Sequence, residues 1–186
     1  MTMARQALFL DRDGVINVDR GYVHRIDQCE FIPGVFELVT AAHRAGYLVL
    51  IVTNQSGIGR GYYTEEQFHA LMDWMAAQFS RRGGKIDRVY FCPEHPEHGI
   101  GKYRAATRRR KPGPGMLLEA ADDFDIDMAR SILVGDNPSD MRAGYAANVG
   151  RNFLLRQSDE VRSSDPEDDD ADCEVVSSLL QLVERL

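Results

Sequence analysis

The sequence contains few cysteines and has no long apolar run. Its 186 residues include three cysteines, Cys29, Cys92 and Cys173, an odd number spread widely along the chain. This pattern speaks against a disulfide framework and favours free thiols in a reducing compartment. No apolar stretch approaches the roughly 20 residues that a membrane-spanning helix needs. The start, "MTMARQALFLDRDG", lacks the apolar core and cleavage site of a secretory signal. We therefore expect a cytoplasmic protein that does not associate with a membrane.

Negative charge is concentrated in one segment. The formal net charge is -7, but residues 159–174 contain nine acidic residues and one arginine, so the rest of the chain carries about +1. We expect this segment to be a solvated loop or tail within the domain. The overall composition, 44% hydrophobic and 27% charged, is that of an ordinary globular protein with one sizeable core.

Strand-like apolar runs alternate with helix-like amphipathic segments. The strand-like runs are residues 7–11, 47–54, 86–92, 131–136 and 151–156, and "CEVV" near the end is a possible edge strand. "TEEQ", which begins at Thr64, has the pattern of a capping box at the start of a helix. Strands that alternate with helices form parallel sheets covered on both faces. We predict a single α/β domain over residues 1–186, with five parallel strands and a possible sixth.

Two carboxylates follow the first predicted strand. In "FLDRDG", Asp11 and Asp13 are separated by Arg12, so continued strand geometry would place both carboxylates on one side and Arg12 on the other. Neighbouring carboxylates repel each other unless a cation neutralises them, and Mg²⁺ prefers oxygen ligands. The alternative is a polar strand exit in which an aspartate caps a turn.

A second pair of carboxylates follows the run at residues 131–136. In "LVGDNPSD", Asp136 ends the strand and Asp140 comes at the start of a helix. Because ligands of such sheets bind at the carboxyl ends of the strands, these groups are expected to converge with the first pair. The alternative is that Asp140 or Ser139 caps the helix, which would leave Asp136 unexplained.

Two further residues have the chemistry to bind phosphate. Thr53 ends the strand-like run of residues 47–54, and its hydroxyl could contact a phosphoryl oxygen. Lys111 precedes Pro112 and is therefore expected in an extended or turn conformation, where its ammonium could neutralise a phosphoryl group. The alternatives for the surrounding "TRRRK" are a solvated basic loop and a nucleic-acid-binding patch.

Taken in order, these four motifs resemble those of the haloacid dehalogenase superfamily. The resemblance covers nearly the whole chain and implies a three-layer, Rossmann-like phosphatase fold. It implies that Asp11 is the nucleophile, that Asp13 is the general acid and then base, and that Thr53 and Lys111 hold the phosphoryl oxygens. It also implies that Asp11, Asp136 and the backbone carbonyl of Asp13 are ligands of Mg²⁺. Asp140 is implied to support this site without binding the ion.

The spacing of the motifs leaves no room for a large cap domain. Only 39 residues separate Asp13 from Thr53, and 57 separate Thr53 from Lys111. Both intervals also contain predicted helices and strands. We therefore expect an open site whose specificity depends on short loops.

The loops resemble those of the D-glycero-D-manno-heptose-1,7-bisphosphate 7-phosphatase and histidinol-phosphate phosphatase family. "NVDRGYVH" favours the heptose enzymes, which remove the 7-phosphate in nucleotide-activated heptose biosynthesis for lipopolysaccharide, surface layers or capsule. The substrate contacts that this resemblance implies are Asp19, Arg20, Gly21, Tyr22, Asn54, Gln55, Ser56, Arg110 and Asn137. A second phosphate on the substrate would suit Arg110, whereas Asn137 stands where relatives frequently have lysine.

Two alternatives stay open. One is a phosphatase for histidinol phosphate or another small phosphomonoester. The other is a nucleic-acid 3′-end phosphatase that uses residues 102–111, of which six are basic. The acidic chain and the scarcity of aromatic residues near this run disfavour the second alternative. We expect a monomer that acts on a small anionic sugar phosphate and does not bind nucleic acid.

The segment "FCPEHPEHGIGKYRAATRRRK" departs from the zinc loop that is usual in this family. Relatives have Cys-x-His followed by Cys-x-Cys, whereas this chain keeps Cys92 and has Glu94, Thr107 and Arg109 at the other three positions. Cys92 with His95 and His98 would still lack a fourth ligand. We therefore expect no structural zinc.

Overall fold

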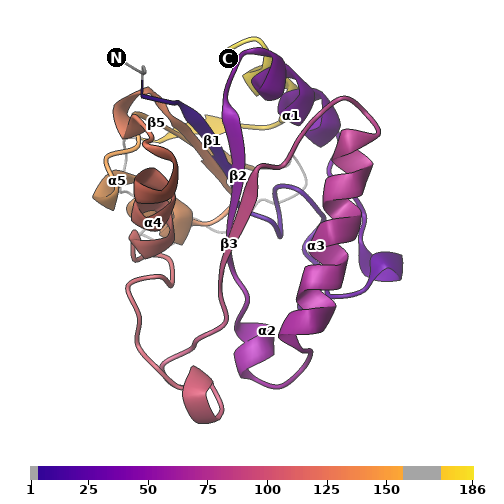
Figure 1. The fold of residues 1–186 in the computed structure, drawn as a ribbon, viewed down its shortest axis with the longest axis vertical. Coiled ribbons are helices and arrows are strands. Elements are labelled where there is room, and N and C mark those ends of the chain that lie inside the picture. Colours follow the sequence, from indigo (N-terminus) through magenta and orange to yellow (C-terminus); the bar gives the residue numbers. More distant parts are fainter. Residues whose placement is uncertain (1–3, 157–172) are drawn as a thin grey trace.

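The computed structural model describes residues 4–156 and 173–186. Its six strands form one parallel sheet in the order β3-β2-β1-β4-β5-β6 (Figure 1). The strands are β1 (Ala7–Leu10), β2 (Leu48–Asn54), β3 (Arg88–Cys92), β4 (Ile132–Gly135), β5 (Arg151–Leu155) and β6 (Glu174–Val176). The predicted α/β class and the possible sixth strand are thus confirmed. Residues 159–172 of the predicted acidic segment lie outside the described residues.

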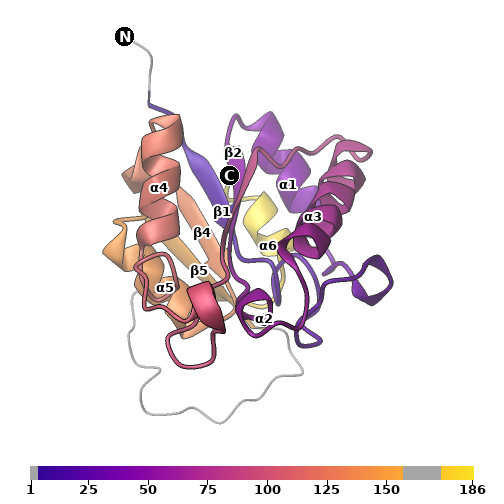
Figure 2. The ribbon, with the colours of Figure 1, turned by 60° about the horizontal axis from the view of Figure 1, so that its bottom comes forward.

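Helices cover both faces of the sheet. They are α1 (Val35–Arg44), α2 (Ser56–Gly59), α3 (Glu65–Ser80), α4 (Gly115–Phe124), α5 (Pro138–Ala146) and α6 (Leu180–Val183). Figure 2 shows α4 and α5 on one side of the strands and α1, α3 and α6 on the other. The buried apolar side chains accordingly form two clusters, one on each face.

Strand β1 shows why the central strands read as continuous apolar runs. Leu8 and Leu10 point into the cluster shared with α1 and α3, whereas Ala7 and Phe9 point into the cluster shared with α4 and α5. All four side chains are fully buried. A strand covered on both faces has no position for a polar side chain. Burial of each large apolar side chain stabilises the fold by about 1.5–3 kcal/mol.

Local capping explains where two helices begin. Thr64 Oγ1 accepts a hydrogen bond from the Gln67 amide, and Gln67 Oε1 accepts one from the Thr64 amide, so the predicted capping box is present. At α5 the alternative interpretation, in which Asp140 or Ser139 caps the helix, holds only for Asp140, which takes part in a capping box. The cap is Asn137, whose Oδ1 accepts from the Ser139 amide at 3.0 Å, while Asp140 Oδ2 accepts from the Asn137 amide at 3.1 Å.

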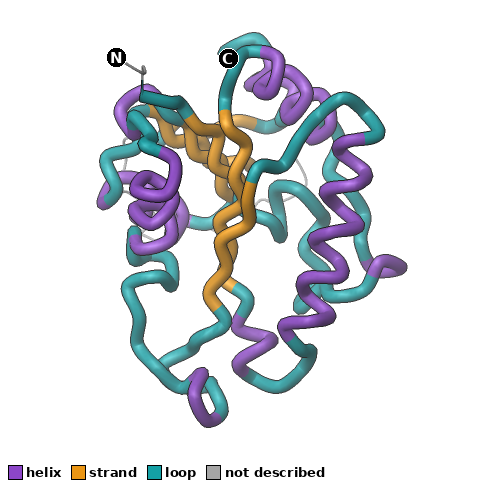
Figure 3. The backbone as a smooth tube through the Cα atoms, viewed as in Figure 1, coloured by secondary structure: helices purple, strands orange, loops and turns teal. Residues whose placement is uncertain are grey.

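The connections that follow β1 and β2 consist of loops and helices. Between β1 and β2 the chain forms a loop, a 3₁₀ turn at Ile26–Gln28 and α1, and between β2 and β3 it forms α2 and α3. Residues 4–156 contain no inserted cap domain. Figure 3 shows the loops of this edge, including the long loop between β3 and α4, below the strands. Among the described helices, none combines the length and apolar character needed to cross a membrane.

Candidate active site

A cavity of about 410 Å³ opens at the carboxyl ends of the central strands. Most residues that the sequence indicated as functional line it together. They are Asp11, Asp13, Asp19, Gly21, Tyr22, Thr53, Asn54, Gln55, Ser56, Lys111, Asp136, Asn137 and Asp140. They come together because parallel strands place all their carboxyl ends at one edge of the sheet.

Three carboxylates and one ammonium form the floor of this cavity. Oxygens of Asp11, Asp136 and Asp140 all lie within 4.8 Å of one another. Lys111 Nζ lies 3.0 Å from Asp11 Oδ1 and 2.6 Å from Asp140 Oδ1. It also donates to the backbone carbonyl of Val52 at 2.9 Å. Lys111 is 4% exposed, so its charge acts within a largely desolvated group.

The three carboxylates carry more negative charge than Lys111 neutralises. Burial raises the pKa of Asp11 to about 8, since the opposing effect of Lys111 is incomplete and Asp140 and Asp136 add repulsion. Burial and Asp140 raise the pKa of Asp136 to about 7. For Lys111, burial alone would lower the pKa, but Asp11 and Asp140 more than offset it and hold the pKa above its ordinary value. A clustered oxygen-donor set with excess negative charge fits a hard divalent cation.

Asn54 holds the backbone of Lys111 in place. Its Nδ2 donates to the Lys111 carbonyl at 3.0 Å, and its Oδ1 accepts from the Lys111 amide at 3.0 Å. The side chain of Asn54 therefore joins the end of β2 to the loop that precedes α4. The sequence indicated Asn54 as a substrate contact but contained no signal for this structural pairing.

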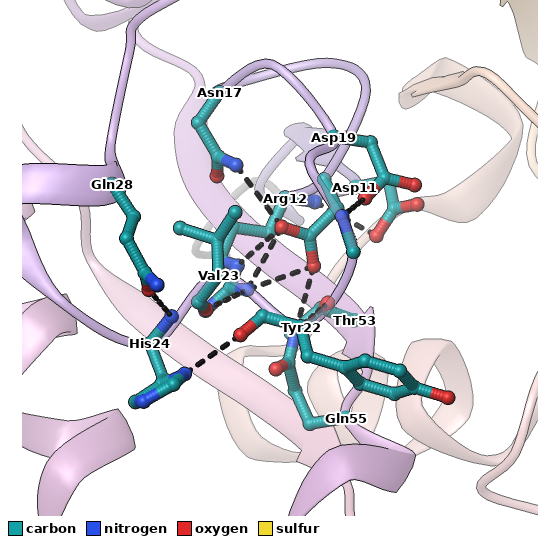
Figure 4. Close-up of polar contacts among 12 residues, drawn as sticks. Asp11, Arg12, Asn17, Asp19, Tyr22, Val23, His24, Gln28, Thr53 and Gln55 are labelled. Atoms are coloured by element: carbon teal, nitrogen blue, oxygen red, sulfur yellow. Dashed lines mark hydrogen bonds and ion pairs between the residues drawn. The ribbon is translucent and has the colours of Figure 1, made fainter. Parts of the chain in front are cut away.

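Arg12 does not turn away from the carboxylates as continued strand geometry predicted. Its guanidinium folds back onto Asp13, with Nη2 at 2.8 Å from both carboxylate oxygens. Arg12 is fully buried and also donates to the Val23 carbonyl at 2.6 Å (Figure 4). The prediction failed because β1 ends at Leu10, so the strand alternation does not continue through Arg12.

Two amide side chains, labelled Asn17 and Gln55 in Figure 4, donate hydrogen bonds to the carboxylate of Asp13. Asn17 Nδ2 donates to Asp13 Oδ1 at 3.0 Å. Gln55 Nε2 donates to Asp13 Oδ2 at 3.1 Å and to Thr53 Oγ1 at 2.8 Å. Thr53 itself is 1% exposed. Gln55 therefore links Asp13, the predicted general acid and base, to Thr53, which is predicted to bind a phosphoryl oxygen.

The loop after β1 brings Asp19, Gly21 and Tyr22 to the cavity but turns Arg20 away. Tyr22 has a left-handed backbone, with φ of 56°, which is uncommon for a bulky residue and is often found at functional sites. Arg20 forms an exposed ion pair with Glu30 and lines a neighbouring cavity instead.

Arg110 also lies outside the lining of the main cavity. It is half-buried, and its Nη1 is 3.4 Å from the Glu94 carbonyl. Burial, together with the nearby Arg60, lowers the pKa of Arg110. The cavity is instead lined by Gly57, Tyr63 and Ser139, which the sequence did not indicate as site residues. Nothing in their local sequence marks them, because they reach the cavity only through the packing of α2, α5 and the loop after α2.

Side chains connect the ends of the loop between β3 and α4, for which the sequence predicts no structural zinc. Cys92 Sγ donates to Glu94 Oε2 at 3.2 Å, and burial together with Glu94 raises the pKa of Cys92 to about 12. Arg109 Nη2 donates to the Phe91 carbonyl at 3.0 Å, and its Nε lies 3.4 Å from the Glu119 carboxylate. Arg109 thus connects the loop to β3 and α4.

The two histidines of this loop lie beside each other. The ring centroids of His95 and His98 are 4.6 Å apart, and His95 Nδ1 accepts from the backbone amides of Glu97 and His98. Within the described residues, the side chains that converge closely enough to hold a metal ion are Asp11, Asp136 and Asp140, a group that does not include these histidines.

Comparison with known proteins gives consistent matches. The HAD-hydrolase-like family model matches residues 108–182. The chain is 56% identical over 160 residues to D-glycero-alpha-D-manno-heptose-1,7-bisphosphate 7-phosphatase of Burkholderia mallei, covering 86% of this chain and 85% of the relative. It is 45% identical to D-glycero-beta-D-manno-heptose-1,7-bisphosphate 7-phosphatase of Escherichia coli, covering 100% and 96%.

A solved structure supports the same relationship. The D,D-heptose 1,7-bisphosphate phosphatase of B. bronchiseptica, complexed with magnesium and phosphate, superimposes with a TM-score of 0.80. The two chains are 29% identical, and the match covers 97% of each. The predicted family resemblance is therefore confirmed in both sequence and fold.

Proposed function

The chain belongs to the D-glycero-D-manno-heptose-1,7-bisphosphate 7-phosphatase family of HAD-like hydrolases, and we propose that it removes the 7-phosphate of D-glycero-D-manno-heptose 1,7-bisphosphate. The observation that carries this proposal is the buried pairing of Asp11 with Lys111 beside Asp136, in a cavity lined by the loop typical of the heptose enzymes. A carboxylate beside a fixed ammonium is suited to attack a bound phosphoryl group.

The reaction proceeds in two displacements. In the first, a carboxylate oxygen of Asp11 attacks phosphorus, the bond from phosphorus to the sugar O7 breaks, and Asp13 gives its proton to O7. In the second, Asp13 takes a proton from water, whose oxygen attacks phosphorus and displaces Asp11. Thr53 and Lys111 contact the phosphoryl oxygens throughout, so that positioning and charge neutralisation supply most of the rate enhancement.

The carboxylate cluster fits Mg²⁺, with Asp11, Asp136 and the backbone carbonyl of Asp13 as the groups that would hold it. When bound, the ion would neutralise charge on the phosphoryl oxygens. Asp140 supports the site from behind, since its carboxylate binds the Lys111 ammonium at 2.6 Å and accepts a hydrogen bond from the amide of Asn137, the N-cap of α5. Its side chain is 1% exposed, which suits a supporting role.

The sugar is held by the loops around the cavity. Asp19, Gly21 and Tyr22 come from the loop after β1, and Ser56 comes from the start of α2. Arg110 adjoins Lys111 in the chain and would meet the second phosphate of the substrate. Because loops surround the site and residues 4–156 contain no cap domain, specificity depends on these contacts.

The biological setting follows from the substrate. A heptose 7-phosphatase acts in nucleotide-activated heptose biosynthesis, which supplies lipopolysaccharide, surface layers or capsule. The three cysteines are unpaired, in keeping with a reducing compartment. We place the enzyme in the cytoplasm, as a monomer.

The direct test is phosphate release from the α- and β-anomers of heptose 1,7-bisphosphate, compared with histidinol phosphate and a short 3′-phosphorylated oligonucleotide. Each substrate is assayed with Mg²⁺ and with excess EDTA. The proposal requires the highest kcat/KM on one of the heptose bisphosphates, and only in the presence of Mg²⁺. A higher kcat/KM on histidinol phosphate or on the oligonucleotide would overturn it.

A further inference from the structure

Gln55 connects three side chains at the wall of the cavity. Its Nε2 donates to Asp13 Oδ2 and Thr53 Oγ1, and its Oε1 accepts a 2.5 Å hydrogen bond from the Tyr63 hydroxyl. The two ends of a primary amide differ, since one donates and the other accepts. The ionised carboxylate of Asp13 only accepts hydrogen bonds, so Nε2 faces Asp13, and the Tyr63 hydroxyl, which donates to Oε1, holds the amide in that orientation. Gln55 is 2% exposed, so the bulk solvent has little access to it.

The ring of Tyr63 is closely packed. It is 4% exposed, and its ring stacks on His24 with centroids 4.8 Å apart and planes 2° from parallel. His24 Nδ1 in turn lies 2.8 Å from the Tyr22 carbonyl. A side chain at Gly57 would come within 2.3 Å of the Tyr63 ring, so the absence of one there leaves room for the ring. The hydroxyl of Tyr63 is thus placed by its surroundings and not by Gln55 alone.

The two oxygens of Asp13 accept from different amide side chains. Oδ1 accepts from Arg12 and from Asn17, whereas Oδ2 accepts from Arg12 and from Gln55. If the Gln55 amide turned over, its carbonyl oxygen would face Asp13 Oδ2, where it would repel the ionised carboxylate and would compete with the sugar oxygen for the proton of the acid form. The orientation of Gln55 therefore decides whether the carboxylate of Asp13 is held on both sides or pushed out of place.

We propose that Tyr63 is a positioning residue for Asp13 and acts through the side chain of Gln55. The inference rests on the proposed function, in which Asp13 gives a proton to the leaving sugar oxygen. Proton transfer depends steeply on the geometry of the acid, so loss of the orienting hydroxyl lowers the rate of chemistry more than the affinity for substrate.

The central test is Tyr63→Phe, which removes the hydroxyl and keeps the ring. We expect kcat on heptose bisphosphate to fall about tenfold with KM unchanged, as for loss of one buried hydrogen bond that orients a reacting group. The matched control is Tyr90→Phe, because Tyr90 is also buried and its hydroxyl donates to Asp123 at 2.7 Å on the α4 face of the sheet. The control should keep its kcat. An unchanged kcat in Tyr63→Phe, or a rise in KM alone, would overturn the inference.

Gln55 binds both Asp13 and Thr53, and a substrate with a better leaving group shows which of the two carries the effect of Tyr63. In p-nitrophenyl phosphate the phenolate departs without a proton, so formation of the phosphoenzyme no longer needs Asp13 as an acid. We expect kcat/KM of Tyr63→Phe to fall about tenfold on heptose bisphosphate but to stay within about twofold of wild type on the aryl phosphate. Equal losses on both substrates would rule out the route through Asp13 and point to Thr53.

A double-mutant cycle tests whether Gln55 is the intermediary. In a Gln55→Ala background, Tyr63→Phe should have no further effect on kcat, because the group that it orients is absent. Additive losses would overturn the inference. If the wild type instead prefers another alkyl phosphate, the proposed function fails, while the same variants on that substrate still decide the role of Tyr63.

Discussion

Lys111 Nζ lies 3.0 Å from Asp11 Oδ1, and only 3% and 14% of the two side chains are exposed. The lysine comes from the loop before α4 and the aspartate from the end of β1. Asn54 fixes the backbone of Lys111, and the Val52 carbonyl accepts from its ammonium. The positive charge is therefore set beside the proposed nucleophile before any substrate arrives.

Replacement of Lys111 tests how much its positive charge contributes to catalysis. Lys111→Met keeps most of the length of the side chain but removes its charge, so a phosphoryl group would be bound without its ammonium. We expect kcat on heptose bisphosphate to fall about 100- to 1,000-fold, the range seen when one donor to a developing charge is lost. Steady-state phosphate release measures the effect. The exposed Lys102→Met in the same loop is the control and should keep full activity; a similar loss there would refute the assignment.

Replacement of Asp11 tests the covalent mechanism. Asp11→Asn should abolish phosphate release, because an amide is not a competent nucleophile. The melting temperature without metal should not fall, since one of three crowded carboxylates is removed. Rapid acid quench and mass analysis should detect a phosphorylated wild-type enzyme and none of this species in the variant. Undiminished turnover of Asp11→Asn would contradict the two-displacement mechanism, and Asp122→Asn on the exposed face of α4 serves as control.

Removal of the metal tests the carboxylate cluster. EDTA should abolish activity and added Mg²⁺ should restore it. Loss of a group that merely supports a ligand commonly weakens metal binding about 10- to 100-fold, so Asp136→Asn should raise the Mg²⁺ concentration for half-maximal activity by at least that much. Mg²⁺ should also raise the melting temperature of the wild type more than that of the variant, because binding stabilises the folded state. Equal Mg²⁺ dependence in both proteins would exclude Asp136 as a ligand.

The thiol of Cys92 provides a pH-dependent prediction. Its pKa is raised to about 12, so the thiolate that reacts with thiol reagents is scarce below that pH. We expect Cys92 to react slowly at pH 9 in the folded protein and rapidly after unfolding in urea, as followed by mass analysis of the labelled peptide. Rapid labelling of Cys92 in the folded protein at pH 9 would contradict this.

The same shift affects stability. An unfolded thiol ionises near its ordinary pKa of 9.0, whereas the folded thiol stays protonated up to about pH 12. The folded state then binds more protons than the unfolded state, so this contribution to stability is complete below pH 9.0 and is lost as the pH rises toward 12. Cys92→Ala should flatten this part of the curve of unfolding free energy against pH.

Arg109 is the basis of a prediction about the loop between β3 and α4. Arg109→Ala removes the donor to the Phe91 carbonyl and the contact with Glu119, and the exposure of the guanidinium limits the loss to about 1–2 kcal/mol of unfolding free energy. Urea denaturation measures this loss, with Arg108→Ala as the neighbouring control.

We also expect metal analysis of the purified protein to show no stoichiometric zinc. One equivalent of zinc that resists dialysis would overturn that expectation.

Several features of the site could be predicted from local sequence. Buried strands and their polar ends are encoded within a few residues, so the apolar runs at residues 7–11, 47–54 and 131–136 indicated where the edge of the sheet lies. Asp11 and Asp136 follow because a parallel sheet places successive strand ends together. The prediction for Arg12 failed, since it extended strand geometry beyond the last residue of β1.

The sequence by itself determined the class of fold, the order of the strands along the chain and the chemical groups that meet at their carboxyl ends. Only the tertiary structure decided how those groups are held: Asn54 on the backbone of Lys111, Arg12 on Asp13, and Tyr63 on Gln55. These contacts depend on side-chain rotamers and on the packing of segments distant in sequence. Hydrophobic periodicity carries no information about either, because it records only which face of an element is buried.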